Sequence, residues 1–307
     1  MYPPHVFAAN PLDRAEQERR DEEWIAKAIE RPGSKFLPMF GLNPLIQRKS
    51  DASLGWLTRE RLVALPANGP RPVLLGLLDG VAHFAVNASD LNDPTDDLKL
   101  EDGWQFEDAR AAAADVSGPE TGILAQARAQ IDWHVRHRFC SVCGNQSEPR
   151  RGGQMRKCPV CGAEHFPRTD PVVIMLVYSG DKCILGQTRA RSRSGFYSCL
   201  AGFMDQGEAI EEAVRREVRE ESGLELESIV YHSSQPWPFP SSLMIGSHAK
   251  AATEEVKFDA EEMTDVRWFT RDEVKAALRG EHPEINVPGP IAIAHHLIKW
   301  WADGNVK

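Results

Sequence analysis

Acidic side chains crowd one segment of this 307-residue chain. Residues 208–222 are predicted to form a helix that Gly223 closes, because glycine is a suitable C-cap. At about 100° per residue, Glu217, Glu220 and Glu221 fall on the apolar stripe that should face the core. Two like charges about 4 Å apart repel by about 4 kcal/mol at an effective dielectric of about 20. Three carboxylates against a core therefore require a compensating cation.

The identity of that cation follows from the chemistry of its ligands. Ligand sets made only of oxygen favour Mg²⁺ or Mn²⁺ over zinc. Mg²⁺ held by carboxylates typically completes its shell with water and substrate phosphate. The alternative is a solvated charge run, which would place its glutamates away from the apolar stripe. The residues alone therefore favour phosphate chemistry that uses Mg²⁺ or Mn²⁺.

Four of the six cysteines form a second cluster, with spacing typical of a metal site. Two Cys-x-x-Cys pairs are separated by 14 residues, and a glycine follows each pair; the cysteines are Cys140, Cys143, Cys158 and Cys161. Because four thiolates close the coordination shell, we predict one structural zinc ion per chain. Four unliganded cysteines are the alternative. Basic side chains between the pairs also suit nucleic acid, although a solvated basic face explains them more simply.

A third feature is the proline-rich segment at residues 234–242, Ser-Gln-Pro-Trp-Pro-Phe-Pro-Ser-Ser. Three prolines fix the backbone, so Trp237 and Phe239 have little conformational entropy left to lose. Rigid aromatic rings suit stacking on flat rings, and the flanking Gln and Ser side chains can form hydrogen bonds. A Pro-rich surface connection, with Trp237 in the core, is the alternative. The residues alone leave both interpretations open.

Composition excludes several classes of protein. The hydrophobic fraction of 42% and the charged fraction of 26% are ordinary for a globular protein, so a wholly disordered chain is excluded. The net charge of −9 disfavours general binding to duplex nucleic acid. No apolar run approaches the roughly 18 residues of a spanning helix, and the N-terminus lacks an apolar signal core. We therefore expect a cytoplasmic protein with no membrane partner.

The remaining pattern predicts helices packed on a mixed sheet. Residues 71–88 are typical of a hairpin around Asp79-Gly80, and 88–103 of a loop. Helices are expected at 13–30, 107–115, 120–136, 208–222, from 271 onward and from 290 to about 302. Strands are expected at 171–178, 182–186, 196–201, 226–232, 243–252 and 266–269, and a loop carries Arg189, Arg191 and Arg193.

The glutamate segment resembles the Nudix box, Gly-x5-Glu-x7-Arg-Glu-apolar-x-Glu-Glu-x-Gly-apolar. The matching residues are Gly202, Glu208, Arg216, Glu217, Val218, Glu220, Glu221, Gly223 and Leu224. The resemblance implies hydrolysis of a nucleoside diphosphate linked to another moiety, with divalent cations held on this helix. It implies that Glu217, Glu220 and Glu221 are catalytic metal ligands, joined by the backbone carbonyl of Ala201. Gly202, Glu208, Arg216 and Gly223 then have structural roles.

The proline-rich segment resembles the SQPWPFPxS motif of the NudC-like NADH pyrophosphatases, a Nudix subfamily with a four-cysteine zinc ribbon directly before the Nudix domain. Here Trp133-His134, followed by Phe139 and the first cysteine pair, looks like the ribbon entry, and residues 167–171 look like its exit. The resemblance covers roughly residues 130–300. Upstream of it, the resemblance implies only an N-terminal domain.

The subfamily resemblance implies cleavage of NADH or NAD⁺ to AMP and a nicotinamide mononucleotide (NMNH or NMN), in a homodimer. Some members also remove NAD caps from RNA 5′ ends. Glu262 matches a further metal ligand, although Glu254, Glu255 and Glu261 compete for that role. The residues that match substrate contacts are Phe166, Phe203, Gln235, Pro236, Trp237, Pro238, Phe239, Pro240, Ser241, Ser242 and Ala294. Phe166 replaces a tyrosine of some relatives, which keeps the ring face but loses the hydroxyl.

We therefore expect an α+β protein: a Nudix α/β/α sandwich with a mixed sheet, preceded by a zinc ribbon and an α+β N-terminal domain. The expected domains are residues 1–135, 136–167 and 168–307. One rival hypothesis is a Nudix hydrolase for ADP-ribose or dinucleoside polyphosphates. The other is a non-catalytic RNA-binding or sensor protein, which the intact glutamate set and the acidic charge disfavour. Which glutamate is the base, and the ranking of NADH, NAD⁺ and capped RNA, stay open.

Overall fold

The computed structural model describes residues 4–62, 65, 71–189 and 195–306. Contacts divide the chain into two compact units. The N-terminal unit comprises Val6–Thr169 and Trp237–Ser241, and the C-terminal unit comprises Met1–His5, Asp170–Pro236 and Ser242–Lys307. The predicted loop positions Arg191 and Arg193 lie outside the described residues. No helix in the described part of the chain is long and apolar enough to cross a membrane.

The N-terminal unit contains a sheet in the order β3-β2-β1-β5-β4, with β6 paired to β2. Its strands are β1 (Lys35–Phe40), β2 (Asn43–Arg48), β3 (Ala52–Leu54), β4 (Val73–Leu78), β5 (Val81–Asn87) and β6 (Trp104–Phe106). β1 and β5 are parallel, and the other pairs are antiparallel. The predicted hairpin is confirmed as β4–β5. Asp79 and Gly80 both have positive φ in its turn, at 50° and 76°, which matches the twist of the strands.

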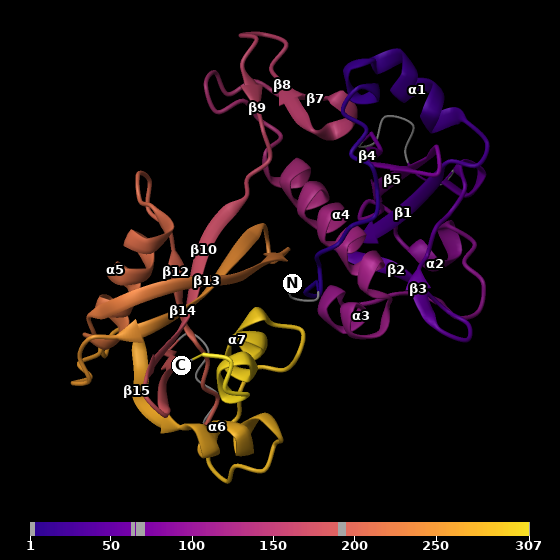
Figure 1. The fold of residues 1–307 in the computed structure, drawn as a ribbon. Coiled ribbons are helices and arrows are strands. Elements are labelled where there is room, and N and C mark those ends of the chain that lie inside the picture. Colours follow the sequence, from indigo (N-terminus) through magenta and orange to yellow (C-terminus); the bar gives the residue numbers. More distant parts are fainter. Residues whose placement is uncertain (1–3, 63–64, 66–70, 190–194, 307) are drawn as a thin grey trace. The chain divides into compact units, whose positions relative to one another are not determined.

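Helices cover this sheet. They are η1 (Glu18–Arg20), α1 (Glu22–Glu30), η2 (Arg59–Leu62), α2 (Pro94–Asp97), α3 (Ala109–Asp115) and α4 (Gly118–Arg136). Figure 1 shows α4 lying against β1 and β5. The helix predicted at 13–30 begins only at Glu22, because the Asp21 carboxylate accepts from the Glu23 and Trp24 amides and caps it there. The predicted loop at 88–103 contains the short helix α2, which Asp93 caps.

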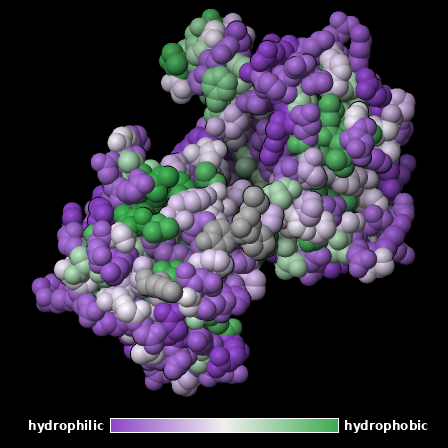
Figure 2. Space-filling view, viewed as in Figure 1, coloured by the Kyte–Doolittle hydropathy of each residue, from purple (hydrophilic) through white to green (hydrophobic). Residues whose placement is uncertain are grey.

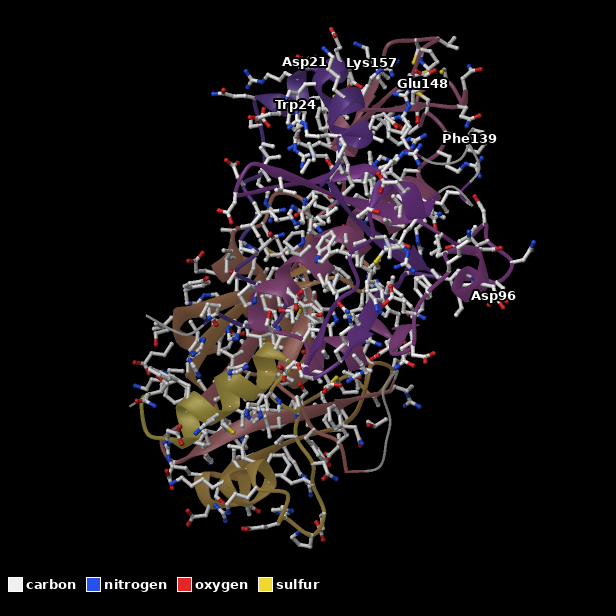
Figure 3. All side chains as sticks on the ribbon, turned by 90° about the vertical axis from the view of Figure 1, so that its right-hand side faces the viewer. Asp21, Trp24, Asp96, Phe139, Glu148 and Lys157 are labelled. Atoms are coloured by element: carbon white, nitrogen blue, oxygen red, sulfur yellow. The ribbon has the colours of Figure 1, made fainter. Side chains whose placement is uncertain are left out.

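The cysteine segment forms a separate three-stranded sheet in the N-terminal unit. It comprises β7 (Glu148–Arg150), η3 (Arg151–Gly153), β8 (Met155–Lys157) and β9 (Glu164–His165). Glu148 and Lys157, labelled in Figure 3, are register partners on β7 and β8. With so little sheet and so few apolar side chains, this part has almost no core of its own, which is why a metal ion is needed to hold it together.

The C-terminal unit contains a second sheet in the order β13-β14-β10-β11-β15, with β12 paired to β10. Its strands are β10 (Asp170–Ser179), β11 (Lys182–Thr188), β12 (Leu200–Phe203), β13 (Leu226–Trp237), β14 (Ser242–Ala251) and β15 (Met263–Thr270). Its helices are α5 (Ile210–Ser222), α6 (Arg271–Leu278) and α7 (Ile293–Ala302). β10 and β14 are parallel, whereas β10 is antiparallel to β11 and β12, so the sheet is mixed as predicted.

Alternate residues of β10 face different cores. Val173 packs in one core with Val214 of α5, and Ile174 packs in the other with Leu297 of α7. Figure 1 accordingly shows α5 on one face of the sheet and α7 on the other. The period of two in a strand buried on both faces explains why residues 171–178 form a continuous apolar run. The predicted α/β/α sandwich is confirmed.

Two predicted strands differ most from the structure in their bounds. The strand predicted at 196–201 begins at Leu200, because Phe196 and Ser198 form isolated bridges to Asn286 and Gly186 instead of a continuous ladder. The strand predicted at 226–232 continues to Trp237, so the start of the proline-rich segment is extended strand. A proline within a strand is tolerated where its missing amide is not needed by a neighbour.

Candidate active site and zinc site

Helix α5 carries the predicted metal ligands. At its start, the Ala209 amide donates to Glu212 Oε2 at 2.7 Å, which satisfies one of the free helix-terminal amides. At its end, Gly223 adopts φ 73° and donates to the carbonyl of Arg219 at 2.8 Å. A left-handed C-cap is the conformation for which glycine is preferred. These two ends fix which residues of α5 face the sheet.

Glu217 and Glu221 face the interior, with exposed fractions of 8% and 5%. Glu220 was predicted on the same stripe, and this is wrong: its side chain is 54% exposed. At 100° per residue Glu220 stands about 60° from Glu217, far enough round the helix to reach solvent. The inward-facing carboxylates are therefore a pair, with Glu220 at its solvent edge.

The backbone of β12 lies directly against this pair. A Cβ added at Gly202 would lie 2.0 Å from Cδ of Glu217, so no other residue fits there without displacing the carboxylate. The Ala201 amide donates to Glu221 Oε2 at 3.0 Å. Gly202, which is part of the sequence motif, thus provides the space for Glu217. The predicted ligand Ala201 lies next to Glu221.

Arg216 supplies the positive charge that holds the carboxylates together in this structure. It bonds Glu208 at 2.6 and 2.9 Å, Glu217 at 2.7 Å and Glu220 at 3.1 Å, and it donates to the carbonyl of Phe203 at 2.8 Å. Its hydrogen bonds to Glu208 lower the pKa of that carboxyl to about 2. The structural role predicted for Glu208 and Arg216 agrees with this pairing.

Arg216 leaves Glu221 uncompensated. Burial, and then the charge of Glu217, raise the pKa of Glu221 to about 8. Burial also raises the pKa of Glu217, although Arg216 opposes that effect. Glu262, which is exposed, adds to the negative potential at both groups. Two buried carboxylates with raised pKa values and oxygen-only ligands fit a divalent cation.

The four ribbon cysteines are already arranged for a metal. Their sulfur atoms all lie within 4.8 Å of one another, at 3.6 Å for Cys140–Cys161 and 3.4 Å for Cys143–Cys158. A zinc tetrahedron with bonds of about 2.3 Å has edges of about 3.8 Å. The Asn145 amide donates to Cys143 Sγ at 3.5 Å and lowers the pKa of that thiol to about 6. These cysteines form a structural zinc site.

The knuckles that carry the cysteines expose apolar side chains. Val142 and Val160 are 73% and 67% exposed, and Figure 2 shows hydrophobic residues in green at the tip of this ribbon.

Among the residues that the structure describes, only the four cysteines bring three or more potential ligand atoms so close together. The glutamate oxygens are not gathered in this way, because Arg216 bonds Glu217 and Glu220. Binding a dication there requires these side chains to turn toward it.

The aromatic part of the proline-rich segment packs within the N-terminal unit. Trp237 and Phe239 contact each other at 5.3 Å between ring centroids, and each lies 5.8 Å from Phe7. The guanidinium carbons of Arg110 and Arg128 lie 4.0 and 4.5 Å from the centre of the Phe239 ring. Arg128 also donates to the carbonyl of Pro238. Both rings are thus partly buried in a cation–π cluster.

Gln235 is fully buried, and its side chain is engaged in the C-terminal unit. It donates to the carbonyl of Ile291 at 2.8 Å and accepts from the Ile293 amide at 2.7 Å, so it fixes the start of α7. Ala294, in the first turn of α7, is buried in the core. Phe166 and Phe203 are 59% and 61% exposed, which leaves their rings open for stacking.

The remaining predicted contacts have varied surroundings. Pro236 and Ser242 belong to the C-terminal unit, whereas Phe166 and residues 237–241 belong to the N-terminal unit with the zinc ribbon. Pro240, which is exposed, follows Phe239 through a cis peptide bond. Ser241 and Ser242 are half-buried at the start of β14. The sequence missed Phe7, Arg110 and Arg128, because nothing in their spacing points to Phe239.

Three family models match the chain in succession: an NADH pyrophosphatase-like rudimentary NUDIX domain at 33–133, an NADH pyrophosphatase zinc ribbon domain at 136–166 and a NUDIX domain at 168–287. The chain is also 37% identical to the NAD-capped RNA hydrolase NudC of Mycobacterium bovis, over 94% of this chain and 92% of that protein. The chain belongs to the NADH pyrophosphatase family of Nudix hydrolases.

Two further relatives of this Nudix hydrolase come from mammals. The human NAD-capped RNA hydrolase NUDT12 is 34% identical, over 97% of this chain and 73% of that protein. The mouse mitochondrial NAD(P)H pyrophosphatase NUDT13 is 40% identical, over 68% of this chain and 63% of that protein. The matches to NUDT12 and to the bacterial protein span nearly all of this chain. They include the region upstream of the zinc ribbon, where sequence motifs are sparse.

Proposed function

We propose that this Nudix hydrolase cleaves the pyrophosphate of NADH and NAD⁺ to AMP and NMNH or NMN, and that it removes NAD caps from RNA. The observation that carries the proposal is the buried Glu217–Glu221 pair against the Gly202 backbone, in a chain whose relatives are named for these two activities. The motif that resembles the subfamily's substrate segment, residues 234–242, supports NADH over ADP-ribose or dinucleoside polyphosphates.

We propose Mg²⁺ or Mn²⁺ as the catalytic cation, held by Glu217, Glu220 and Glu221 with Glu262 and the Ala201 carbonyl. When bound, such an ion neutralises phosphate charge and activates water. The chain's own residues do the rest: Gly202 leaves room for the Glu217 carboxylate, and the Ala201 amide orients Glu221 by its hydrogen bond.

We propose that substrate rings stack on Phe166 and Phe203, whose faces are open. Trp237 and Phe239, with the prolines and serines around them, are proposed to complete the substrate site. Gln235 and Ala294 are buried. We therefore propose that these two residues shape the backbone near α7 rather than offer a large contact surface.

The assembly and the domain division are also proposals. The subfamily resemblance supports a homodimer, which light scattering of the purified protein tests directly.

The proposed location is the cytoplasm, whose reducing environment suits the zinc-binding thiolates. The name of the mouse relative, in contrast, includes a mitochondrial location. The three domains at 1–135, 136–167 and 168–307 stay our proposed division.

The test is product-resolved turnover of NADH, NAD⁺ and NAD-capped RNA, with and without Mg²⁺ or Mn²⁺. ADP-ribose and a dinucleoside polyphosphate are the rival substrates. We expect AMP release that requires the cation and that falls about 100-fold or more in Glu221→Gln, because a proposed ligand of the cation is lost. Glu227→Gln, an exposed glutamate of β13 that pairs with Lys250, is the matched control.

Three outcomes would contradict the proposal or its site assignment. Faster turnover of ADP-ribose or the dinucleoside polyphosphate than of NADH would assign a different Nudix substrate. Binding of RNA without any product from any substrate would indicate the non-catalytic alternative. Equal turnover by Glu221→Gln and the wild type would remove Glu221 from the active site.

A further inference from the structure

The N-terminal unit contains a cavity of about 350 Å³ outside the candidate active site. It is lined by the start of the chain, by α4, by the end of η3 and by the segment that leaves the zinc ribbon. Its polar lining residues are Arg14, Arg19, Gln126, Gln130, Gln154, Arg168 and Thr169. No acidic residue lines it in the described part of the chain. The volume falls in the range typical of small-molecule sites.

Arg19 gives the cavity a buried positive charge, and none of the carboxylates that the structure describes is bonded to it. Arg19 is only 2% exposed. Its guanidinium donates to the backbone carbonyls of Arg14 at 2.5 Å, Leu74 at 2.7 Å, Leu75 at 3.2 Å and Arg151 at 3.3 Å. These bonds hold the group rigidly, but all four acceptors are neutral. A buried charge without a counter-ion is costly, and this cost is relieved when an anion binds beside it.

Arg14, which is exposed, adds a second positive charge to the cavity lining. Within the described residues, its guanidinium makes no hydrogen bond and no ion pair. Burial lowers the pKa of Arg14, and burial followed by the charge of Arg14 lowers the pKa of Arg19 to about 10. Glu16, the nearest acidic influence on Arg19, is bonded instead to Arg20 and Arg151. The cavity thus has an excess of positive charge.

Amide groups complete the lining. Oε1 of Gln130 accepts from Gln126 at 3.1 Å, and the NH₂ group of Gln130 makes no bond in the described part of the chain. Oε1 of Gln154 is buried and lacks a hydrogen-bond donor. A buried acceptor of this kind is satisfied by a hydroxyl group, such as those of a ribose.

We propose that this cavity binds a nucleotide, with its phosphate between Arg14 and Arg19 and a ribose hydroxyl donating to Gln154. The planar guanidinium of Arg14 can match the geometry of phosphate oxygens, whereas Arg19, which already donates four N–H groups to carbonyls, offers its charge and its remaining N–H group. Two guanidiniums match the double negative charge of a phosphate better than the single charge of a carboxylate. The same chemistry is offered by a free mononucleotide and by a nucleotide within RNA. The site is separate from the catalytic glutamates and does not depend on the proposed reaction.

The test is calorimetry on the full-length, zinc-loaded protein without added Mg²⁺ or Mn²⁺. The probes are uridine monophosphate, an uncapped RNA tetranucleotide and inorganic phosphate. We expect Arg14→Gln to weaken nucleotide binding about tenfold or more, because it removes a charged hydrogen bond to phosphate. Arg20→Gln is the matched control, since Arg20 is exposed and pairs with Glu16 outside the cavity lining.

The probes separate the sources of the nucleotide. Tighter binding of uridine monophosphate than of RNA indicates a free nucleotide as the ligand, and tighter binding of RNA indicates an RNA segment. Either result supports the site if Arg14→Gln loses that binding. Gln130→Leu should weaken the same binding, and unchanged NADH turnover shows that both variants are folded. The proposal is overturned if no nucleotide probe binds the wild type at millimolar concentration, if inorganic phosphate binds but neither nucleotide does, or if Arg14→Gln binds as tightly as the wild type.

Discussion

At the scale of single residues, the candidate site depends on a missing side chain. Gly202 lies in β12 opposite Val173, with the Glu217 carboxylate in the volume that a Cβ would need. Its role is therefore steric, since it does not have the positive φ that usually explains a glycine. The helix brings Glu217 to the sheet, and Gly202 lets it stay there.

Gly202→Ala should lower NADH turnover tenfold or more while the protein stays folded. The new methyl group would lie 2.0–2.1 Å from the carboxylate atoms, so Glu217 must swing away from β12. Steady-state kinetics and circular dichroism on the same samples measure the two effects. Gly289→Ala is the control, because a Cβ there meets nothing within 4 Å. Full turnover in Gly202→Ala would show that the position of Glu217 does not matter.

At the scale of elements, β13 positions α7. The side chain of Gln235, near the end of β13, bonds both the carbonyl of Ile291 and the amide of Ile293. Ala292, the residue before α7, offers no capping side chain. Gln235 therefore supplies the hydrogen-bond acceptor that a Ser or Asp would normally provide at a helix start.

Removing this link should destabilise the C-terminal unit. We expect Gln235→Ala to lower the free energy of unfolding by about 2–3 kcal/mol, because the buried Ile293 amide and the half-buried Ile291 carbonyl both lose their partner. Urea denaturation followed by tryptophan fluorescence measures the change. Gln206→Ala, at an exposed glutamine of the same unit, should change it by less than about 0.5 kcal/mol. A substrate-binding role alone would leave the stability of Gln235→Ala intact.

At the scale of the whole molecule, residues far apart in sequence share one buried polar cluster. The ring nitrogens His5 Nε2 and His232 Nδ1 lie 2.7 and 2.6 Å from the hydroxyl oxygen of Ser233. His5 and Ser233 are 228 positions apart in the sequence. Burial, followed by the nearby His296, lowers the pKa of His5 to about 4. Burial, followed by the nearby His248, lowers the pKa of His232 to about 4. Both imidazoles are therefore neutral in the folded protein.

The stability of the protein should fall as the pH drops below 6.5. The unfolded chain takes up protons on these histidines near pH 6.5, whereas the folded chain resists them until about pH 4. Stability that is fully present above pH 6.5 is therefore lost between 6.5 and 4, by about 1 kcal/mol for each histidine at pH 5.5.

Thermal unfolding between pH 7.5 and 5.5 measures this dependence. His5→Asn should be less stable than the wild type at pH 7.5, and the difference should narrow at pH 5.5. Parallel pH curves for His5→Asn and the wild type would show that His5 does not resist protonation.

Sequence patterns predicted most elements of the C-terminal unit because their periodicity is strong. The apolar run of β10 and the helix closed by Gly223 each depend on neighbours within a few residues. The cysteine pairs of the N-terminal unit were predicted for the same reason. Fewer elements of the N-terminal unit were predicted: nothing local distinguished β1 and β2, or the short helix α2. The buried stripe of the glutamate helix was predicted too wide, because it included Glu220, which is exposed. A helical wheel gives the direction of each side chain, but it does not say how wide the buried stripe is.

The sequence by itself determined the chemistry: which side chains can hold a dication or a zinc ion, and which family the chain resembles. These properties follow from residue types at short spacings, and local geometry carries them. Only the tertiary structure decided which atoms meet: Glu217 against Gly202, Gln235 at the start of α7, and Arg14 and Arg19 in one cavity that no carboxylate of the described residues lines. Such contacts join distant positions, and they depend on the packing of whole sheets and helices, which no short pattern encodes.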